Sequence, residues 1–388
     1  MKRFLISLAA VAIFACASDP AKKPGAAGAS PADGEPSPVG VIPTTLLHDA
    51  QRNKDLDVSI SYPTRGGPFP VIIFSHGYGS SNRAYEPLVA HWTSHGYVVI
   101  RPAHADAGAL REALRDRGAE RREEQQQGRR ERRKPTPEEL QQQAQFRPNP
   151  SESIWEKERE PQWRDRARDV ALVIDSLGDL ETRFPELKGK IDAKKIGVGG
   201  HSYGAFTALL LAGMKTSGNP PLQLADPRVN AVLAMSPQGI AANRGLTAES
   251  WRDVKTPAMF MTGTRDFGAA EIETPLWRRD PFEHSPAGDK YYVLIEGARH
   301  ITFAGIASTA APEADLVIPE QTVDPVTGQR MVTRVPRSGG WYVADRGLHE
   351  RIRSIALTFW DAYLKSDAKA KEKLSAGQFG GNVTVEKK

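Results

Sequence analysis

The segment from Ile196 to Gly213, IGVGGHSYGAFTALLLAG, constrains the fold of this chain more than any other. Its centre, Gly200-His201-Ser202-Tyr203-Gly204, has the pattern G-x-S-x-G, in which a serine lies on a tight turn between a strand and a helix. Glycines flank the serine because a Cβ at either position would collide with the neighbouring backbone. Because the chain has 34 glycines, this five-residue pattern can arise by chance and is weak evidence by itself. An apolar run before the motif and a helical pattern from Ala205 to Ala212 supply the strand-turn-helix context that the prediction needs.

Overall composition excludes several classes of protein. The formal net charge is +5, part of it in the basic N-terminus, which is too little to predict nucleic-acid binding. The single cysteine cannot form an internal disulfide. No cluster of His, Cys and Asp has metal-ligand spacing, and no phosphate-binding glycine motif follows a strand. We therefore expect neither a metal nor a cofactor, and the sequence does not indicate an oligomeric state.

The N-terminus has the pattern of an export signal. A basic start is followed by an apolar run of 11 residues, Phe4 to Phe14. This run is far shorter than the roughly 20 residues that span a bilayer, so residues 1–17 are interpreted as a signal peptide. Ordinary cleavage after Ala15-Cys16-Ala17 and a bacterial lipobox ending at Cys16 both stay open. We favour lipidation of Cys16, because a flexible linker of Pro, Gly, Ala and charged residues follows at 18–40.

These two cleavage patterns predict different locations for the protein. Lipidated Cys16 would anchor the exported chain to the membrane of a bacterial cell envelope. With ordinary cleavage the protein would be periplasmic or secreted.

From about residue 41 the chain alternates between short apolar runs and helical patterns. Continuous apolar runs such as Val71 to Phe74 are typical of strands buried on both faces of a parallel sheet. Strands are predicted at Leu56–Tyr62, Val71–Phe74, Tyr97–Ile100, Lys195–Gly199, Val229–Met235, Ala258–Met261 and Tyr291–Ile295, the last clear strand. Helices are predicted at Tyr85–Trp92, Trp163–Leu177, Ala205–Ala212 and Ile352–Tyr363. The pattern predicts an α/β fold whose mostly parallel central sheet is flanked by helices.

Two stretches interrupt this domain, which extends from residue 41 to residue 388. The first is an insertion at about 107–161, where ten basic and six acidic residues lie between Arg111 and Lys134. Such a stretch is typical of a solvated helix or a partly disordered arm, and a lid or a contact with an anionic membrane is the alternative. The second is a Pro-rich excursion at about 305–345.

A glycine-containing loop follows the predicted strand at Val71–Phe74. In Ser75-His76-Gly77-Tyr78-Gly79, the glycines allow backbone N–H groups to turn toward a ligand. Together with the serine turn, this loop predicts an oxyanion hole made by the backbone amides of Tyr78 and Tyr203. A plain connection between strand and helix is the alternative.

Further candidate substrate contacts lie at the ends of predicted strands, where ligands bind in open α/β sheets. For His104 and the nearby Asp106, we favour a role in fixing the loop, with substrate contact as the alternative. The candidates are His76, Gly77, Gly79, His104 and Gln238.

Three residues in chain order complete a candidate catalytic site. A serine hydroxyl is a poor nucleophile until a base removes its proton, and the base needs a carboxylate that fixes its tautomer. Ser202, Asp266 and His300 occur in the order Ser, Asp, His, and each follows a predicted strand. We therefore predict that they meet at one edge of the sheet as a catalytic triad.

The motifs FSHGYG, GHSYG, GTRD and GARH resemble those of α/β-hydrolases of the dienelactone hydrolase and platelet-activating factor acetylhydrolase type. The resemblance covers roughly Asp55 to Asp106 and Arg164 to Lys365. It implies an α/β-hydrolase fold and an esterase or lipase-like activity on an acyl ester. Dienelactone hydrolases have a cysteine where this chain has Ser202, so a lactone substrate is not implied.

These observations predict a serine hydrolase that cleaves a small-molecule or lipid-like carboxylic ester through an acyl-enzyme. The same triad suits amides, so a serine peptidase on this fold is one alternative. A surface binding module without turnover is the other.

Overall fold

The computed structural model describes residues 36–109, 160–218, 220–268, 273–304, 317–323, 330–336 and 346–388. The signal peptide with Cys16, most of the linker, the charged insertion and most of the 305–345 excursion lie outside these residues. Two strands of the excursion, β9 (Val317–Val323) and β10 (Arg330–Pro336), pair antiparallel with each other.

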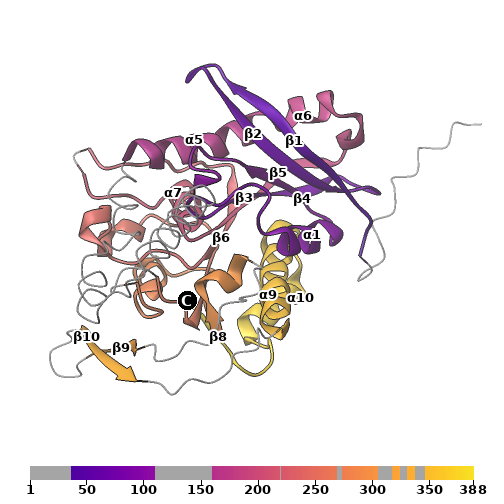
Figure 1. Cartoon of the computed structure of the whole chain (residues 1–388). Coiled ribbons are helices and arrows are strands. Elements are labelled where there is room, and N and C mark those ends of the chain that lie inside the picture. The colour runs from indigo at the N-terminus through magenta and orange to yellow at the C-terminus, as the bar shows by residue number, and fades with distance from the viewer. Residues whose placement is uncertain are drawn as a thin grey trace, which may run out of the picture.

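Within the described residues, nine strands form one sheet in the order β1-β2-β4-β3-β5-β6-β7-β8-β11 (Figure 1). In chain order they are β1 (Val39–Asp49), β2 (Lys54–Pro63), β3 (Phe69–Ser75), β4 (Val98–Pro102), β5 (Ile191–His201), β6 (Val229–Met235), β7 (Ala258–Arg265), β8 (Lys290–Arg299) and β11 (Val383–Lys387). Neighbours from β4 to β8 pair in parallel. The β1–β2 hairpin and β11 pair antiparallel at the two ends of the sheet. The mostly parallel sheet predicted from the sequence is confirmed.

Helices cover both faces of the sheet. Helices α5 (Glu160–Asp175), α6 (Leu177–Arg183) and α7 (Tyr203–Leu211) pack on one face, and α1 (Glu86–Ser94), α9 (Arg346–Leu364) and α10 (Ala368–Ala376) pack on the other. Figure 1 shows α9 and α10 side by side, below α1 in this view. The short elements are α8 (Asp280–His284) and the 3₁₀ turns Pro185–Leu187, Ala242–Arg244, Ala248–Trp251, Trp277–Arg279 and His300–Ala304.

The C-terminal part differs from the sequence-based expectation, which ended the regular structure at the helix that became α9. Asp367 caps α10 by accepting hydrogen bonds from the amides of Lys369 and Ala370. Strand β11 then pairs with β8, so the strand at Tyr291–Ile295 is not the last one. Helix α10 buries only Ala370 and Leu374, and β11 is a short edge strand with charged side chains. Neither element therefore has the apolar periodicity on which the prediction relied.

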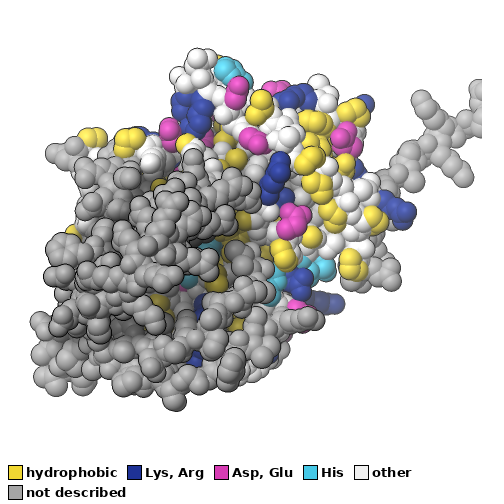
Figure 2. Space-filling view, viewed as in Figure 1, with side chains coloured by type: hydrophobic (Ala, Val, Ile, Leu, Met, Phe, Trp, Pro, Cys, Tyr) yellow, Lys and Arg dark blue, Asp and Glu magenta, His cyan; other side chains and the backbone are white. Residues whose placement is uncertain are grey.

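The described surface carries mixed side chains. On the face seen in Figure 2, basic, acidic and hydrophobic groups are interspersed among the described residues. None of the helices in the described part of the chain is long and apolar enough to cross a membrane.

Candidate active site

Ser202 lies at the turn between β5 and α7 in a strained backbone conformation. Its φ is 55° and its ψ is −117°, a combination that L-residues rarely adopt. The turn leaves no room for side chains at the flanking glycines. A Cβ on Gly200 would lie 2.2 Å from the backbone of Gly204, and a Cβ on Gly204 would lie 1.9 Å from the carbonyl oxygen of Ser75. The motif therefore forms the tight turn that its glycines predict.

Asp266 and His300 form a hydrogen-bonded pair at the carboxyl edge of the sheet. Asp266 directly follows β7 and His300 directly follows β8. Nδ1 of His300 donates to Oδ1 of Asp266 over 2.8 Å, because an ionised carboxylate can only accept. The Asp266 side chain is fully buried, whereas 28% of the His300 side chain is exposed. The imidazole is thus held on one side and accessible on the other.

The His300 ring lies beside the serine turn. Its centre is 4.6 Å from the ring centre of His201, the residue before Ser202. The Ser202 amide also donates to the carbonyl oxygen of Met235 at the end of β6. Ser202, Asp266 and His300 thereby follow the parallel strands β5, β7 and β8 at one edge of the sheet, with β6 between β5 and β7.

A buried arginine, Arg278, contacts this pair and was not found from the sequence. Its Nε lies 3.0 Å from Oδ1 of Asp266, and its Nη2 lies 3.3 Å from Nδ1 of His300. Nη1 donates to the carbonyl oxygens of Ser236 and Pro237. Burial alone would raise the pKa of Asp266, but the charge of Arg278 and the contact with His300 outweigh it and hold this pKa well below its usual range. Asp266 is therefore held as a carboxylate that can accept the hydrogen bond from His300.

Tyr85 connects the loop after β3 to the serine turn. The Gly77 amide donates to the Tyr85 hydroxyl over 3.1 Å, and this hydroxyl lies 2.9 Å from Nδ1 of His201. Burial lowers the pKa of His201 well below its usual value, with a smaller contribution from His300. The ring is therefore neutral, and its Nδ1 accepts a hydrogen bond from the Tyr85 hydroxyl. The sequence predicted Tyr85 only as part of an apolar helix face.

The loop of residues 76–79 packs against the first turn of α7. The rings of Tyr78 and Tyr203 are 6.1 Å apart, and the carbonyl oxygens of Ser75 and His76 come close to Gly204. The two backbone segments that carry the predicted oxyanion donors are therefore neighbours.

Four of the five candidate substrate contacts have partners inside the protein. The amides of Gly77 and Gly79 donate to Tyr85 and to Asp106. Nδ1 of His76 donates to the Gly77 carbonyl oxygen, and its Nε2 accepts from the amide of His104. Both ring nitrogens of His76 are therefore engaged within the protein, and its role as a substrate contact stays a prediction. Asp106 holds the loop through the Gly79 amide, in line with the loop-fixing role that the sequence favours.

His104 belongs to a second Ser-His-Asp arrangement. The Ser75 hydroxyl donates to Nε2 of His104 over 2.8 Å, and Nδ1 of His104 lies 2.9 Å from Oδ2 of Asp169. Ser75, His104 and Asp169 are buried to 2% exposure or less, so a substrate cannot reach them. The position of His104 thus favours a structural role over substrate contact, since both ring nitrogens are occupied.

Gln238 is the one candidate substrate contact whose side chain has a buried oxygen without a hydrogen-bond partner. It is 3% exposed, and its Oε1 has no hydrogen-bond partner in the structure. An unpaired buried acceptor is costly, so Gln238 is the candidate best suited to accept a hydrogen bond from a ligand.

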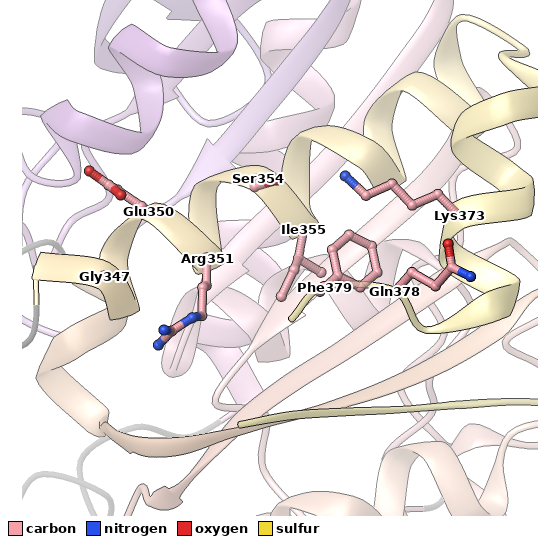
Figure 3. A pocket seen from close by; sticks show the side chains of 8 residues that line it. All are labelled: Gly347, Glu350, Arg351, Ser354, Ile355, Lys373, Gln378 and Phe379. Carbon is pink, nitrogen blue, oxygen red and sulfur yellow. The ribbon is translucent and has the colours of Figure 1, made fainter. Parts of the chain in front are cut away.

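Two other features of the described residues lie outside this site. The donor atoms of Asp280, Glu283 and His284 lie within 4.8 Å of one another, but Asp280 already accepts from the Ile240 amide and Glu283 pairs with Arg279. A surface hollow of about 330 Å³ lies along α9 and the end of α10, where Ile355 and Phe379 meet (Figure 3). None of the candidate site residues lines it.

Buried neutral histidines predict that the protein loses stability in acid. Burial, helped by nearby cationic groups that include His95 and Arg353, lowers the pKa of His91 to about 4. Burial also lowers the pKa of His104 and of His201 well below the usual value. Because the unfolded chain binds protons at about pH 6.5 and these folded-state rings do not, stability is full above that pH and falls as the pH drops.

Thermal unfolding at pH 7.5 and pH 5 checks this expectation. We expect a lower Tm at pH 5, with His91 contributing on the order of 1 kcal/mol after allowance for its partial exposure. His91→Gln should reduce the fall in Tm, whereas His48→Gln on the exposed face of β1 should leave it unchanged. A Tm that is equal at both pH values would contradict the assignment.

Comparison with known proteins agrees with this architecture. A family model described as platelet-activating factor acetylhydrolase, isoform II, matches residues 42–219, just under half of the chain. The matched part includes Tyr78 and Ser202 and ends before Asp266.

Curated relatives match over a similar stretch. Platelet-activating factor acetylhydrolase of Canis lupus familiaris is 29% identical over 151 residues, 37% of this chain and 32% of that protein. The Bos taurus protein of the same name is 28% identical over 151 residues, with the same shares. Chlorophyllase-1 of Arabidopsis thaliana is 35% identical over 69 residues, 16% of this chain and 21% of that protein. The chain thus spans about a third of the length of the acetylhydrolases that it matches. The sheet order and the strained serine turn give the chain an α/β fold of the hydrolase type, and these partial matches show that it resembles the platelet-activating factor acetylhydrolases.

Proposed function

We propose that this protein is a serine hydrolase that cleaves carboxylic esters through an acyl-enzyme intermediate. The observation that carries the proposal is the Asp266–His300 pair beside the serine turn. Ser202 is the nucleophile, His300 the general base and Asp266 the carboxylate that orients the base.

In the acylation step, Nε2 of His300 takes the proton of Ser202 as the serine oxygen attacks the ester carbonyl. Asp266 keeps the Nδ1 proton directed toward itself, which leaves Nε2 as the acceptor. The imidazolium that forms then gives its proton to the leaving alcohol. Water attacks the acyl-enzyme in the second step, with His300 again as base, and releases the acid.

The backbone amides of Tyr78 and Tyr203 would stabilise the negative charge that develops on the carbonyl oxygen. The close approach of the 76–79 loop to the start of α7 supports this pairing. Removal of one such donor costs about 10²–10³ in kcat in enzymes where it has been measured, so the geometry of these segments matters to the rate.

Two observations support an ester with an apolar part. The mammalian relatives are named as acetylhydrolases of platelet-activating factor. In this chain, Ile240 and Ile301 are exposed large apolar side chains, and Ile301 directly follows His300. An exposed apolar side chain next to the base, that of Ile301, suits a lipid-like or short acyl ester.

An ester and peptide panel combined with a fluorophosphonate probe tests the proposal. We expect turnover of short-chain nitrophenyl esters, no cleavage of peptide amides, and covalent labelling of one serine, because only an activated serine reacts readily with the probe. Peptide cleavage at a comparable rate would make the protein a peptidase. Absence of both turnover and labelling would make it a binding module.

A further inference from the structure

A second buried arginine, Arg166, lies on α5 beneath the loop of residues 76–79. Its side chain is 3% exposed, although it comes from a helix whose inward face is otherwise mainly apolar. Nε and Nη2 donate to the two carboxylate oxygens of Asp106 over 3.0 and 2.9 Å. A buried charge is costly unless it is paired with good geometry, and this bidentate contact meets that condition.

The guanidinium contacts the backbone of the loop that carries Tyr78 and the side chain of Tyr203, the two residues whose amides are the proposed oxyanion donors. On the loop side, Nη1 donates to the His76 carbonyl oxygen over 2.9 Å, and Asp106 accepts from the Gly79 amide over 2.8 Å. Tyr78 lies between these two fixed points. On the other side, Cζ of Arg166 lies 4.2 Å from the centre of the Tyr203 ring.

These contacts form one connected unit. Arg166 holds the chain on the N-terminal side of Tyr78, its partner Asp106 holds it on the C-terminal side, and the stacked guanidinium fixes Tyr203 against both. Burial would raise the pKa of Asp106, but the charge of Arg166 outweighs it and lowers this pKa to about 2, so the ion pair persists at any working pH.

We propose that the Arg166–Asp106 ion pair is a positioning unit that sets the placement of the Tyr78 amide relative to the Tyr203 amide. The inference rests on the proposed function, in which these amides bind the oxyanion. Arg166 and Asp106 touch no reacting atom and act through the backbone that they hold. A displacement of about 1 Å in such a site can cost about 10²-fold in rate, whereas binding of the ester depends on other surfaces.

Arg166→Met removes both the bidentate contact with Asp106 and the positive charge. Arg168→Met is its matched control. Arg168 lies on the same helix and pairs with Asp49 on β1, away from the loop. We expect Arg166→Met to lower kcat for a nitrophenyl ester about 10- to 100-fold with little change in KM, and Arg168→Met to leave both unchanged. Arg166→Lys should recover only part of the loss, because an ammonium group cannot make the bidentate contact.

The ratio of turnover of an ester to that of its thionoester reports on the oxyanion hole directly. Sulfur accepts hydrogen bonds more weakly than oxygen, so a well-placed pair of amides favours the oxygen ester. We expect this ratio to fall in Arg166→Met and to stay at the wild-type value in Arg168→Met. A purely structural role for Arg166 would lower the Tm without moving the ratio.

The outcomes separate this inference from the proposed function. If wild-type protein hydrolyses the ester and Arg166→Met keeps the wild-type kcat and ratio, the positioning role is overturned while the proposed function stands. If wild-type protein shows no turnover or probe labelling, the proposed function fails and this inference with it. Should Arg166→Met not fold, Arg166→Lys and Asp106→Asn decide by the same ratio, and an unchanged ratio in both overturns the role.

Discussion

Ser202→Ala is expected to lower kcat for a nitrophenyl ester by about 10⁶, because a triad without its nucleophile retains only the contribution of the oxyanion hole and of binding. The alanine methyl group fits the space of the serine side chain, so KM should change little. Steady-state kinetics with active-site titration of the wild type measures the effect. Persistent turnover at more than about a hundredth of the wild-type rate would remove Ser202 from the role of nucleophile.

The buried second Ser-His-Asp arrangement supplies an internal control for this experiment. Ser75 has the same hydrogen-bonded neighbours that a catalytic serine has, but it is fully buried. We expect a fluorophosphonate probe to label Ser75→Ala and not to label Ser202→Ala. Labelling that disappears with Ser75 would mean that the buried residues become accessible in solution and that the assignment of the two serines is reversed.

Much of the fold could be predicted from the sequence because its central strands are buried on both faces. Apolar runs such as Val71 to Phe74 are typical of a strand within a parallel sheet, and the structure has β3 at this place. The serine turn could be predicted because only glycine fits at positions 200 and 204, so the turn requires a recognisable pair of glycines in the sequence. Asp266 and His300 were found from chain order and from their places after strands, and the structure brings these two into contact.

The charged residues that support the site could not be predicted in the same way. Arg166 and Arg278 each stand in a charged stretch of sequence that is typical of a solvated surface. Their burial depends on carboxylates in other elements, Asp106 for Arg166, 60 residues away, and Asp266 for Arg278, 12 residues away across a loop. Such pairs have no periodic signal, because the partner is chosen by the packed fold. His104 illustrates the reverse case, since its place at a strand end suggested a ligand contact that its burial disfavours.

Asp266→Asn is expected to lower kcat by about 10⁴, the size of the loss seen when a triad aspartate becomes an amide. An amide NH₂ facing Nδ1 favours the tautomer that carries its proton on Nε2, so His300 can no longer accept the serine proton. The change also leaves the buried Arg278 guanidinium without its carboxylate, which predicts a loss of about 3–5 kcal/mol in the free energy of unfolding. Kinetics well below the Tm of the variant separate the two effects.

Asp49→Asn is the matched control, because it tests whether loss of stability alone could explain the kinetic effect. Asp49 is 1% exposed and pairs with Arg52 and Arg168, so its change also removes a buried carboxylate that has two cationic partners, although Arg52 keeps its contact with Asp169. We expect Asp49→Asn to lower the Tm by an amount similar to that of Asp266→Asn while keeping the wild-type kcat. If both variants lost activity in proportion to their loss of stability, Asp266 would have only a structural role and would not orient the base. A loss of kcat confined to Asp266→Asn, with the ester still bound at the wild-type KM, is what a carboxylate that orients the base requires.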